Sequence, residues 1–159
     1  MKKIVSLLLV LVMAFTLLTG CSDPVYDEFE NFLNVEMVET NANYEKITAE
    51  AGKWEKFEED AQLEASLKDV MLPLVEDSLE RLGKISLETE EVKEIKAKYV
   101  KVMEAYKEGF TLILESIQKQ DADKMNEGNE KINEGISLLD EYNKALETMA
   151  EKVGAEIEY

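Results

Sequence analysis

Apolar residues recur every three or four positions along most of the chain after Asp23. The first such series is made up of Phe29, Leu33, Met37, Thr40, Tyr44, Ile47, Ala51 and Trp54. This spacing places them on one face of a helix. Asp23 followed by Pro24 is typical of a helix start, because the carboxylate can cap the first turn and proline fits the first helical position. We therefore predict a helix from Pro24 to about Glu59.

Three more helices are expected from the same periodicity. Asp60 can cap a second one that ends at Gly83 and contains Pro73, where the missing backbone donor should cause a kink. Ser86 or Thr89 can cap a third, ending near Gln120 and Asp121. Asp121 can cap the fourth, whose apolar stripe comprises Met125, Ile132, Ile136, Leu139, Tyr142, Leu146, Met149, Val153 and Ile157.

The predicted fold class is all-α. Short connections force consecutive helices antiparallel, so the simplest assembly is an up-down-up-down four-helix bundle with coiled-coil-like helices. The alternative is three long helices, with the segment around Pro73 folded as an irregular arm. No Pro/Gly/Ser-rich linker follows Asp23, so residues 21–159 are expected to form a single domain.

The first 20 residues have a different pattern. Lys2 and Lys3 precede an apolar stretch, 4–18, which is the layout of a signal peptide. A membrane-spanning helix needs about 20 apolar residues, and here the stretch ends early without a basic flank. A permanent transmembrane helix is therefore the weaker interpretation.

Leu18-Thr19-Gly20-Cys21 resembles the lipobox of bacterial lipoproteins. The resemblance implies that residues 1–20 are removed and that Cys21 receives a thioether-linked diacylglycerol and, in many relatives, an amide-linked acyl chain such as palmitate. A two-chain anchor holds a protein stably on a membrane. The expected location is thus the extracytoplasmic face of the cell membrane. The alternative is an ordinary secretory signal that leaves Cys21 unmodified.

Charge narrows the range of partners. Removal of Lys2 and Lys3 with the leader leaves 16 basic and 35 acidic side chains, a formal charge of −19. Nucleic acid is excluded as a partner, because no basic stripe is present to neutralise phosphates. Arg81 is the single arginine beside 17 lysines, a bias that hints at a low-GC Gram-positive source.

Composition also limits the chemistry. The chain has no histidine and one cysteine, so the usual zinc, di-iron and nucleophile-base sites cannot form. We expect no enzyme activity, no cofactor and no metal site. A ligand groove between helices could be lined by aromatic side chains, although a core position is the simpler interpretation. The candidates for such a groove are Tyr44, Trp54, Tyr99, Tyr106 and Tyr142.

Glycines on the third and fourth helices need a compensating reason, since glycine costs about 1 kcal/mol in a helix interior. Gly109, Gly128 and Gly135 are expected to allow close helix approach. A self-association face or a flexible segment is the alternative. The acid-before-base pairs four residues apart describe a solvated surface: Asp77 with Arg81, Glu94 with Lys98, Glu127 with Lys131 and Asp140 with Lys144.

Two classes of function remain. The favoured one is a noncatalytic interaction or structural module that meets a cell-wall or membrane-protein partner. The alternative is a small-molecule or peptide-binding lipoprotein with an inter-helical groove. The lipobox, the size and the lysine- and glutamate-rich helices also resemble the small helical cell-wall-binding lipoproteins of Bacillus-like bacteria. That resemblance carries no binding motif.

Overall fold

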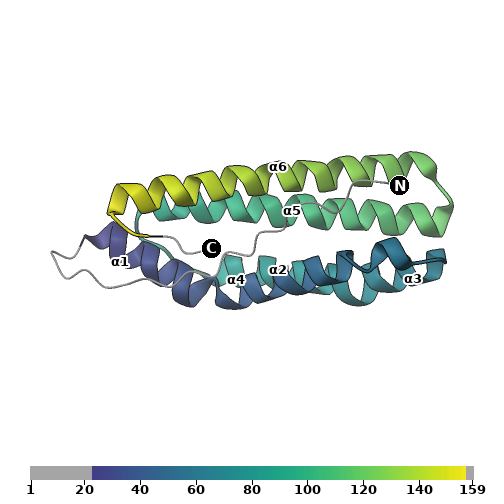
Figure 1. The fold of residues 1–159 in the computed structure, drawn as a ribbon, viewed down its shortest axis with the longest axis horizontal. Helices are drawn as coiled ribbons and strands as arrows, with labels where there is room; N and C mark the ends of the chain where they lie inside the picture. Colours follow the sequence, from purple (N-terminus) through teal and green to yellow (C-terminus); the bar gives the residue numbers. More distant parts are fainter. Residues whose placement is uncertain (1–22, 157–159) are drawn as a thin grey trace.

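The computed structural model of the chain describes residues 23–156, and these are almost entirely helical, without a β-strand (Figure 1). The all-α class predicted from periodicity is confirmed. Cys21 and the predicted signal segment lie outside the described residues.

The first helical segment begins where the sequence indicates. The Asp23 carboxylate accepts a hydrogen bond from the Val25 backbone nitrogen at 3.0 Å, and Pro24 opens the helix. Three elements follow one another: α1 at Pro24–Asn31, the π-helical segment η1 at Phe32–Glu36, and α2 at Val38–Ala51.

The prediction that this helix reaches Glu59 is wrong. Helix α2 ends at Ala51 and Gly52 follows, before the short 3₁₀ helix η2 at Trp54–Lys56. Tertiary contacts of Trp54 explain the early end. Its indole nitrogen donates to the Ser66 hydroxyl at 2.8 Å, and its ring meets Phe110 edge-on with centroids 6.0 Å apart.

The second segment comprises α3 at Asp60–Ser66, the π-helical η3 at Leu67–Met71, and α4 at Leu72–Lys84. Its cap residue is Glu59, one position before the Asp60 that we expected. The chain leaves α-helical geometry just before Pro73, as a π-helical turn. Proline has no N–H to donate to the carbonyl of Asp69, which removes one hydrogen bond of regular α-helix at this point.

The two longest helices are α5 at Glu90–Lys119 and α6 at Ala122–Val153. Thr89, one of the two expected cap residues, is at the cap position of α5. The Asp121 carboxylate accepts from the backbone nitrogens of Asp123 and Lys124 at 3.1 and 3.2 Å. The predicted start of the fourth helix is therefore confirmed.

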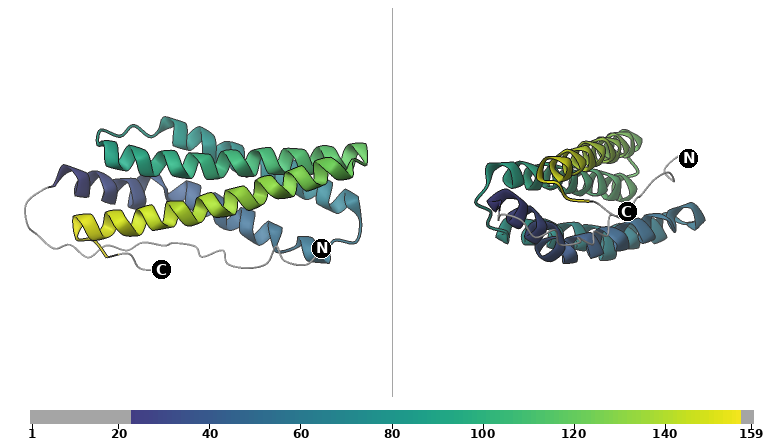
Figure 2. Two further views of the ribbon diagram at one scale, coloured as in Figure 1. Left: turned by 90° about the horizontal axis from the view of Figure 1, so that it is seen from above. Right: turned by 60° about the vertical axis from the view of Figure 1, so that its left-hand side comes forward.

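Consecutive segments reverse direction along the long axis of the molecule (Figure 1). The start of α1, the α4–α5 connection and the end of α6 lie at one end. The start of α3 and the α5–α6 turn lie at the other. Figure 2 shows α5 and α6 side by side in one layer, with α1 to α4 in a second layer against it.

Helices α5 and α6 touch through their glycines. A Cβ atom placed on Gly128 would lie 2.9 Å from the Gly109 carbonyl oxygen and 2.6 Å from the Ile113 side chain. One on Gly135 would lie 2.6 Å from the Tyr106 ring. The close helix approach expected from these glycines is confirmed.

The apolar core receives side chains from helical elements along the whole described chain, from α1 to α6. Phe29, Phe32, Met71 and Met103 are completely buried. Ile136, which belongs to the predicted stripe on α6, is 46% exposed. Gly135 lies at the neighbouring position against Tyr106, and this turns Ile136 outward.

Glu28 fastens α1 to the start of α5. Its carboxylate accepts hydrogen bonds from the Glu88 nitrogen at 2.5 Å, the Thr89 nitrogen at 2.8 Å, and the Thr89 hydroxyl. Partial burial raises the pKa of this carboxyl, but the hydrogen bonds from Thr89 and Glu88 outweigh burial, and the net pKa is below its usual range. Glu28 thus supplies from a distant segment the cap that α5 lacks locally.

We expect Glu28→Gln to lower the free energy of unfolding at neutral pH by about 1.5–3 kcal/mol, because hydrogen bonds to an ionised group are lost. Because the pKa of Glu28 is lower in the folded than in the unfolded state, the ionised carboxylate stabilises the fold at pH values above the unfolded pKa. That contribution disappears as the pH falls through the folded pKa. Denaturant unfolding at a series of pH values should show a difference between variant and wild type that is large at pH 7 and decreases as the pH is lowered. Glu30→Gln, on the same helix, is the matched control. An equal loss of stability in both variants would contradict the cap that Glu28 supplies to α5.

Candidate functional site

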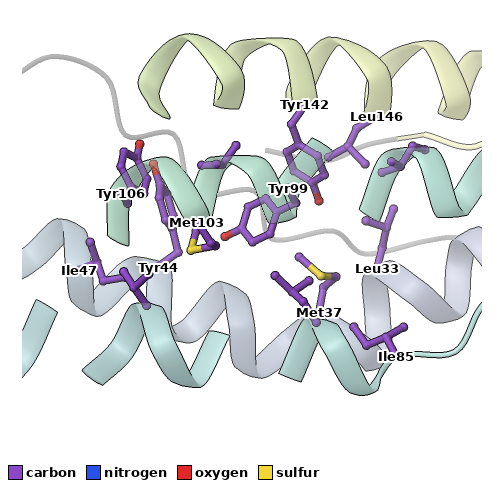
Figure 3. Packing of buried hydrophobic residues seen from close by; sticks show 14 of the residues in the cluster. Leu33, Met37, Tyr44, Ile47, Ile85, Tyr99, Met103, Tyr106, Tyr142 and Leu146 are labelled. Atoms are coloured by element: carbon purple, nitrogen blue, oxygen red, sulfur yellow. The ribbon is translucent and has the colours of Figure 1, made fainter. Parts of the chain in front are cut away.

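Four of the five aromatic candidates lie near one another in the interior (Figure 3). Tyr44 comes from α2, Tyr99 and Tyr106 from α5, and Tyr142 from α6; each is at most 6% exposed. The Tyr99 and Tyr142 ring centroids are 4.8 Å apart, and Tyr44 stacks on Tyr106 at 6.3 Å. We call these four residues the tyrosine cluster.

Phe110 connects the tyrosine cluster to the half-buried Trp54. Its ring stacks on Tyr106 with centroids 5.9 Å apart and receives the edge of Trp54 at 6.0 Å. Phe110 was not among the five aromatic residues that the sequence suggested for a groove. Its position four residues after Tyr106 was the available signal, since such residues are neighbours on a helix.

Two of the surface grooves among the described residues have none of the five aromatic candidates in their lining. The first groove, of about 400 Å³, lies between α2 and the segment preceding Pro73; its lining includes Lys46, Glu50, Lys53 and Asp69. The second, of about 320 Å³, lies at the α5–α6 turn. The four tyrosines are buried in the apolar core.

The tyrosine cluster is electrically neutral. Burial is the largest cause that raises the pKa of each of the four phenols above its ordinary value. The Tyr44 hydroxyl also interacts with that of Tyr106, which raises the pKa of Tyr44 and lowers that of Tyr106. At physiological pH the cluster therefore offers O–H donors and no base.

The buried hydroxyl oxygens of Thr40 and Tyr99 have no hydrogen-bond partner among residues 23–156. Buried polar groups are nearly always hydrogen-bonded, because an unpaired one loses its hydration without compensation. The unpaired hydroxyl of Thr40 was not predicted, because helical spacing assigned Thr40 to the apolar face of the first helix.

A network of hydrogen-bonded polar side chains lies beneath the larger groove. The Ser66 hydroxyl donates to one Glu50 carboxylate oxygen at 2.8 Å, and Lys53 donates to the other at 2.5 Å. The hydrogen bond from Lys53 is the largest cause that lowers the pKa of Glu50. Glu50 is thus an ionised acceptor whose two oxygens are occupied, and it positions Ser66 to accept from Trp54.

Other carboxyl groups with a displaced pKa are shifted in the same direction. Arg81 lowers the pKa of Asp77, and Lys119 with Lys124 lowers that of Glu115 to about 2. These carboxylates are fixed in their ionised form, which makes them poor general acids. Within residues 23–156, no group of three or more His, Cys, Asp or Glu side chains is placed to hold a metal ion.

No helix within residues 23–156 is long and apolar enough to cross a membrane. Comparison of the chain with protein-family models, with curated proteins and with solved structures found no significant match.

Proposed function

We propose that the protein is a noncatalytic lipoprotein that presents a helical domain on the extracytoplasmic face of the cell membrane, anchored by lipid on Cys21. The observation that carries this proposal is the position of Leu18-Thr19-Gly20-Cys21. This lipobox-like sequence follows an apolar leader and ends two residues before Asp23, the residue that caps the first helix of the domain.

In this proposal residues 21–159 form an up-down-up-down four-helix bundle. The reversal of direction between consecutive helical segments supports that arrangement. The start of α1, next to the anchor, then faces the membrane, and the α5–α6 turn is the farthest part. At about 1.5 Å per residue, a helix of the length of α6 spans on the order of 50 Å, so the far end stands well above the lipid surface.

An interaction module fits the chemistry better than an enzyme does. The large apolar side chains are mostly buried, the displaced carboxyl pKa values are lowered, and the phenols are neutral. The expected partner is a cell-wall component or a membrane protein that tolerates a strongly acidic surface. Binding of a small molecule or peptide is the second candidate, and the unpartnered core hydroxyls are the observation that favours it.

Cys21→Ala tests the anchor. When the full precursor is expressed with its own leader, we expect the wild type in the membrane fraction and the variant lost from it, because one missing thiol removes the diacylglycerol. Fractionation followed by immunoblotting measures the distribution. Ser22→Ala is the matched control and should stay with the membrane. Release of the wild type into the soluble fraction would refute the proposal.

A further inference from the structure

The groove at the α5–α6 turn, of about 320 Å³, contains an unsatisfied polar side chain. Ser116 lines this groove, yet the residue is only 3% exposed. Its hydroxyl makes no hydrogen bond among residues 23–156, and unlike those of Thr40 and Tyr99 it is not sealed in the core. It lacks even the bond to the carbonyl four positions earlier that Thr111, on the same helix, makes at 2.8 Å. Since buried polar groups are nearly always paired, this hydroxyl is available to a molecule in the groove.

Two carboxylates line the same groove from different segments. Asp60 is the first residue of α3, and its side chain has no partner among the described residues. Asp121 caps α6 through one carboxylate oxygen, and its second oxygen is unpaired. The end of α5 is fixed against α3 here, because the Gln118 amide donates to the Glu64 carboxylate at 2.8 Å. The groove therefore has two free acceptors that carry negative charge.

The lysines on either side of the turn do not neutralise these carboxylates. Lys119 and Lys124 both bind the Glu115 carboxylate, at 2.8 and 2.9 Å. No lysine or arginine lines the groove. Its negative charge is thus uncompensated, and a cleft of one sign of charge attracts a ligand of the opposite sign.

A metal ion fits this donor set poorly. Calcium takes about six to eight oxygen ligands, and within residues 23–156 no three His, Cys, Asp or Glu side chains are placed to hold an ion. The volume of the groove falls in the range of small-molecule sites, about 300–1,000 Å³. Ile117 and Met125 give the groove an apolar side. An alkylammonium group combines the positive charge, the N–H donors and the short apolar chain that such a lining can bind.

Gln120 adds a neutral acceptor beside the two carboxylates. It is the one non-glycine residue of the described chain with a positive φ, at φ 53° and ψ 43°, and it lines the groove. Its side-chain nitrogen donates to the Ile117 carbonyl at 2.9 Å. The amide oxygen of Gln120 is therefore left to accept a further hydrogen bond.

We propose that the groove at the α5–α6 turn binds a primary ammonium group on a short alkyl chain, with Asp60 and Asp121 as charged acceptors and Ser116 as a neutral one. A small free amine and the lysine side chain of a peptide share this chemistry. The groove lies at the end of the bundle opposite the start of α1 (Figure 1). The inference is independent of the lipid anchor, so failure of the Cys21→Ala test would leave it standing.

Titration of the full mature chain with n-butylamine at pH 7, followed by backbone amide NMR shifts, tests the site. We expect saturable shifts centred on the α5–α6 turn and the start of α3, and none with the uncharged n-butanol. Asp60→Asn and Asp121→Asn should each raise the Kd about tenfold, because a hydrogen bond to a charged group is lost. Asparagine caps helices as well as aspartate does, so Asp121→Asn keeps the start of α6.

Ser116→Ala separates binding from stability. It removes a contact to the ligand but no hydrogen bond of the protein, so the Kd should rise about two- to tenfold while the midpoint of thermal unfolding stays equal or rises. A lower midpoint would mean that the hydroxyl is paired within the fold and would overturn its assignment. Asp123→Asn is the matched control, because Asp123 lies in the same first turn of α6 but does not line the groove. This variant should bind n-butylamine as the wild type does.

The amide of Nα-acetyl-lysine distinguishes the two sources of the ammonium group. Tighter binding of this compound than of n-butylamine indicates the lysine of a peptide, and weaker binding indicates a free amine. The proposal is overturned if neither amine gives saturable shifts, if n-butanol gives the same shifts, or if calcium chloride saturates these residues while the amines do not. Unchanged amine binding in both aspartate variants would overturn it as well.

Discussion

Phe110→Ala is expected to lower the free energy of unfolding by about 3–5 kcal/mol, the range for removal of a buried aromatic ring. Phe110 is 4% exposed and lies between Tyr106 and Trp54. Its loss leaves a cavity and deprives Trp54 of its ring contact. Trp54 is the single tryptophan of the chain, so its fluorescence reports the same change. Denaturant unfolding followed at the tryptophan emission wavelength measures both effects.

Phe57→Ala is the control for Phe110, because it removes the same side chain from a half-buried turn position. Phe57→Ala should lower the free energy of unfolding clearly less than Phe110→Ala does, and it should leave the contact between Trp54 and Phe110 intact. Similar losses for the two variants would mean that the aromatic set is not the packed core described above.

Gly128→Ala is expected to destabilise the domain by about 1–3 kcal/mol through overpacking. The added methyl group would meet the Gly109 carbonyl oxygen at 2.9 Å and the Ile113 side chain at 2.6 Å. The backbone oxygen cannot move aside without separating α5 from α6. Alanine has the higher helix propensity, by about 1 kcal/mol, so a net loss of stability requires a real steric conflict. Thermal or denaturant unfolding gives the sign directly.

Gly83→Ala provides the matched comparison. Gly83 lies in α4, and a Cβ atom there would have no neighbour within 4 Å. This variant should gain about 0.4–1 kcal/mol, because alanine restricts the unfolded chain more than glycine does. If Gly128→Ala were as stabilising as Gly83→Ala, the close contact between α5 and α6 would not exist in solution.

Local sequence signals were sufficient for the all-helical class and for several helix ends. Asp23 with Pro24, and Asp121, act through hydrogen bonds within their own first turn, so the sequence contains the necessary information. The ion pairs of Asp77 with Arg81 and of Asp140 with Lys144 are of the same local kind and are confirmed.

Features set by tertiary contacts were missed. Helix α2 ends early where Trp54 bonds to Ser66, and Glu28 caps a helix some 60 residues away. Lys131, expected to pair with Glu127, pairs with Glu108 of α5 and with Glu134. In each case the deciding partner lies on another segment or competes with the local one, and periodicity contains no information about it.

The residues of the candidate site could be predicted from the sequence, but their position in the fold could not. Helical spacing put Tyr44, Tyr99, Tyr106 and Tyr142 on apolar faces, and all four are buried. Whether they line a groove or fill the core depends on how α2, α5 and α6 pack.

The intact mass of the protein purified from membranes is the decisive measurement for lipid attachment at Cys21. We expect a chain that begins at Cys21 and carries the mass of a diacylglycerol, with or without one further acyl chain. The increment should be located on the N-terminal peptide that contains Cys21. A chain that begins elsewhere, or one that begins at Cys21 without added lipid, would contradict the proposal that this helical domain is lipid-anchored.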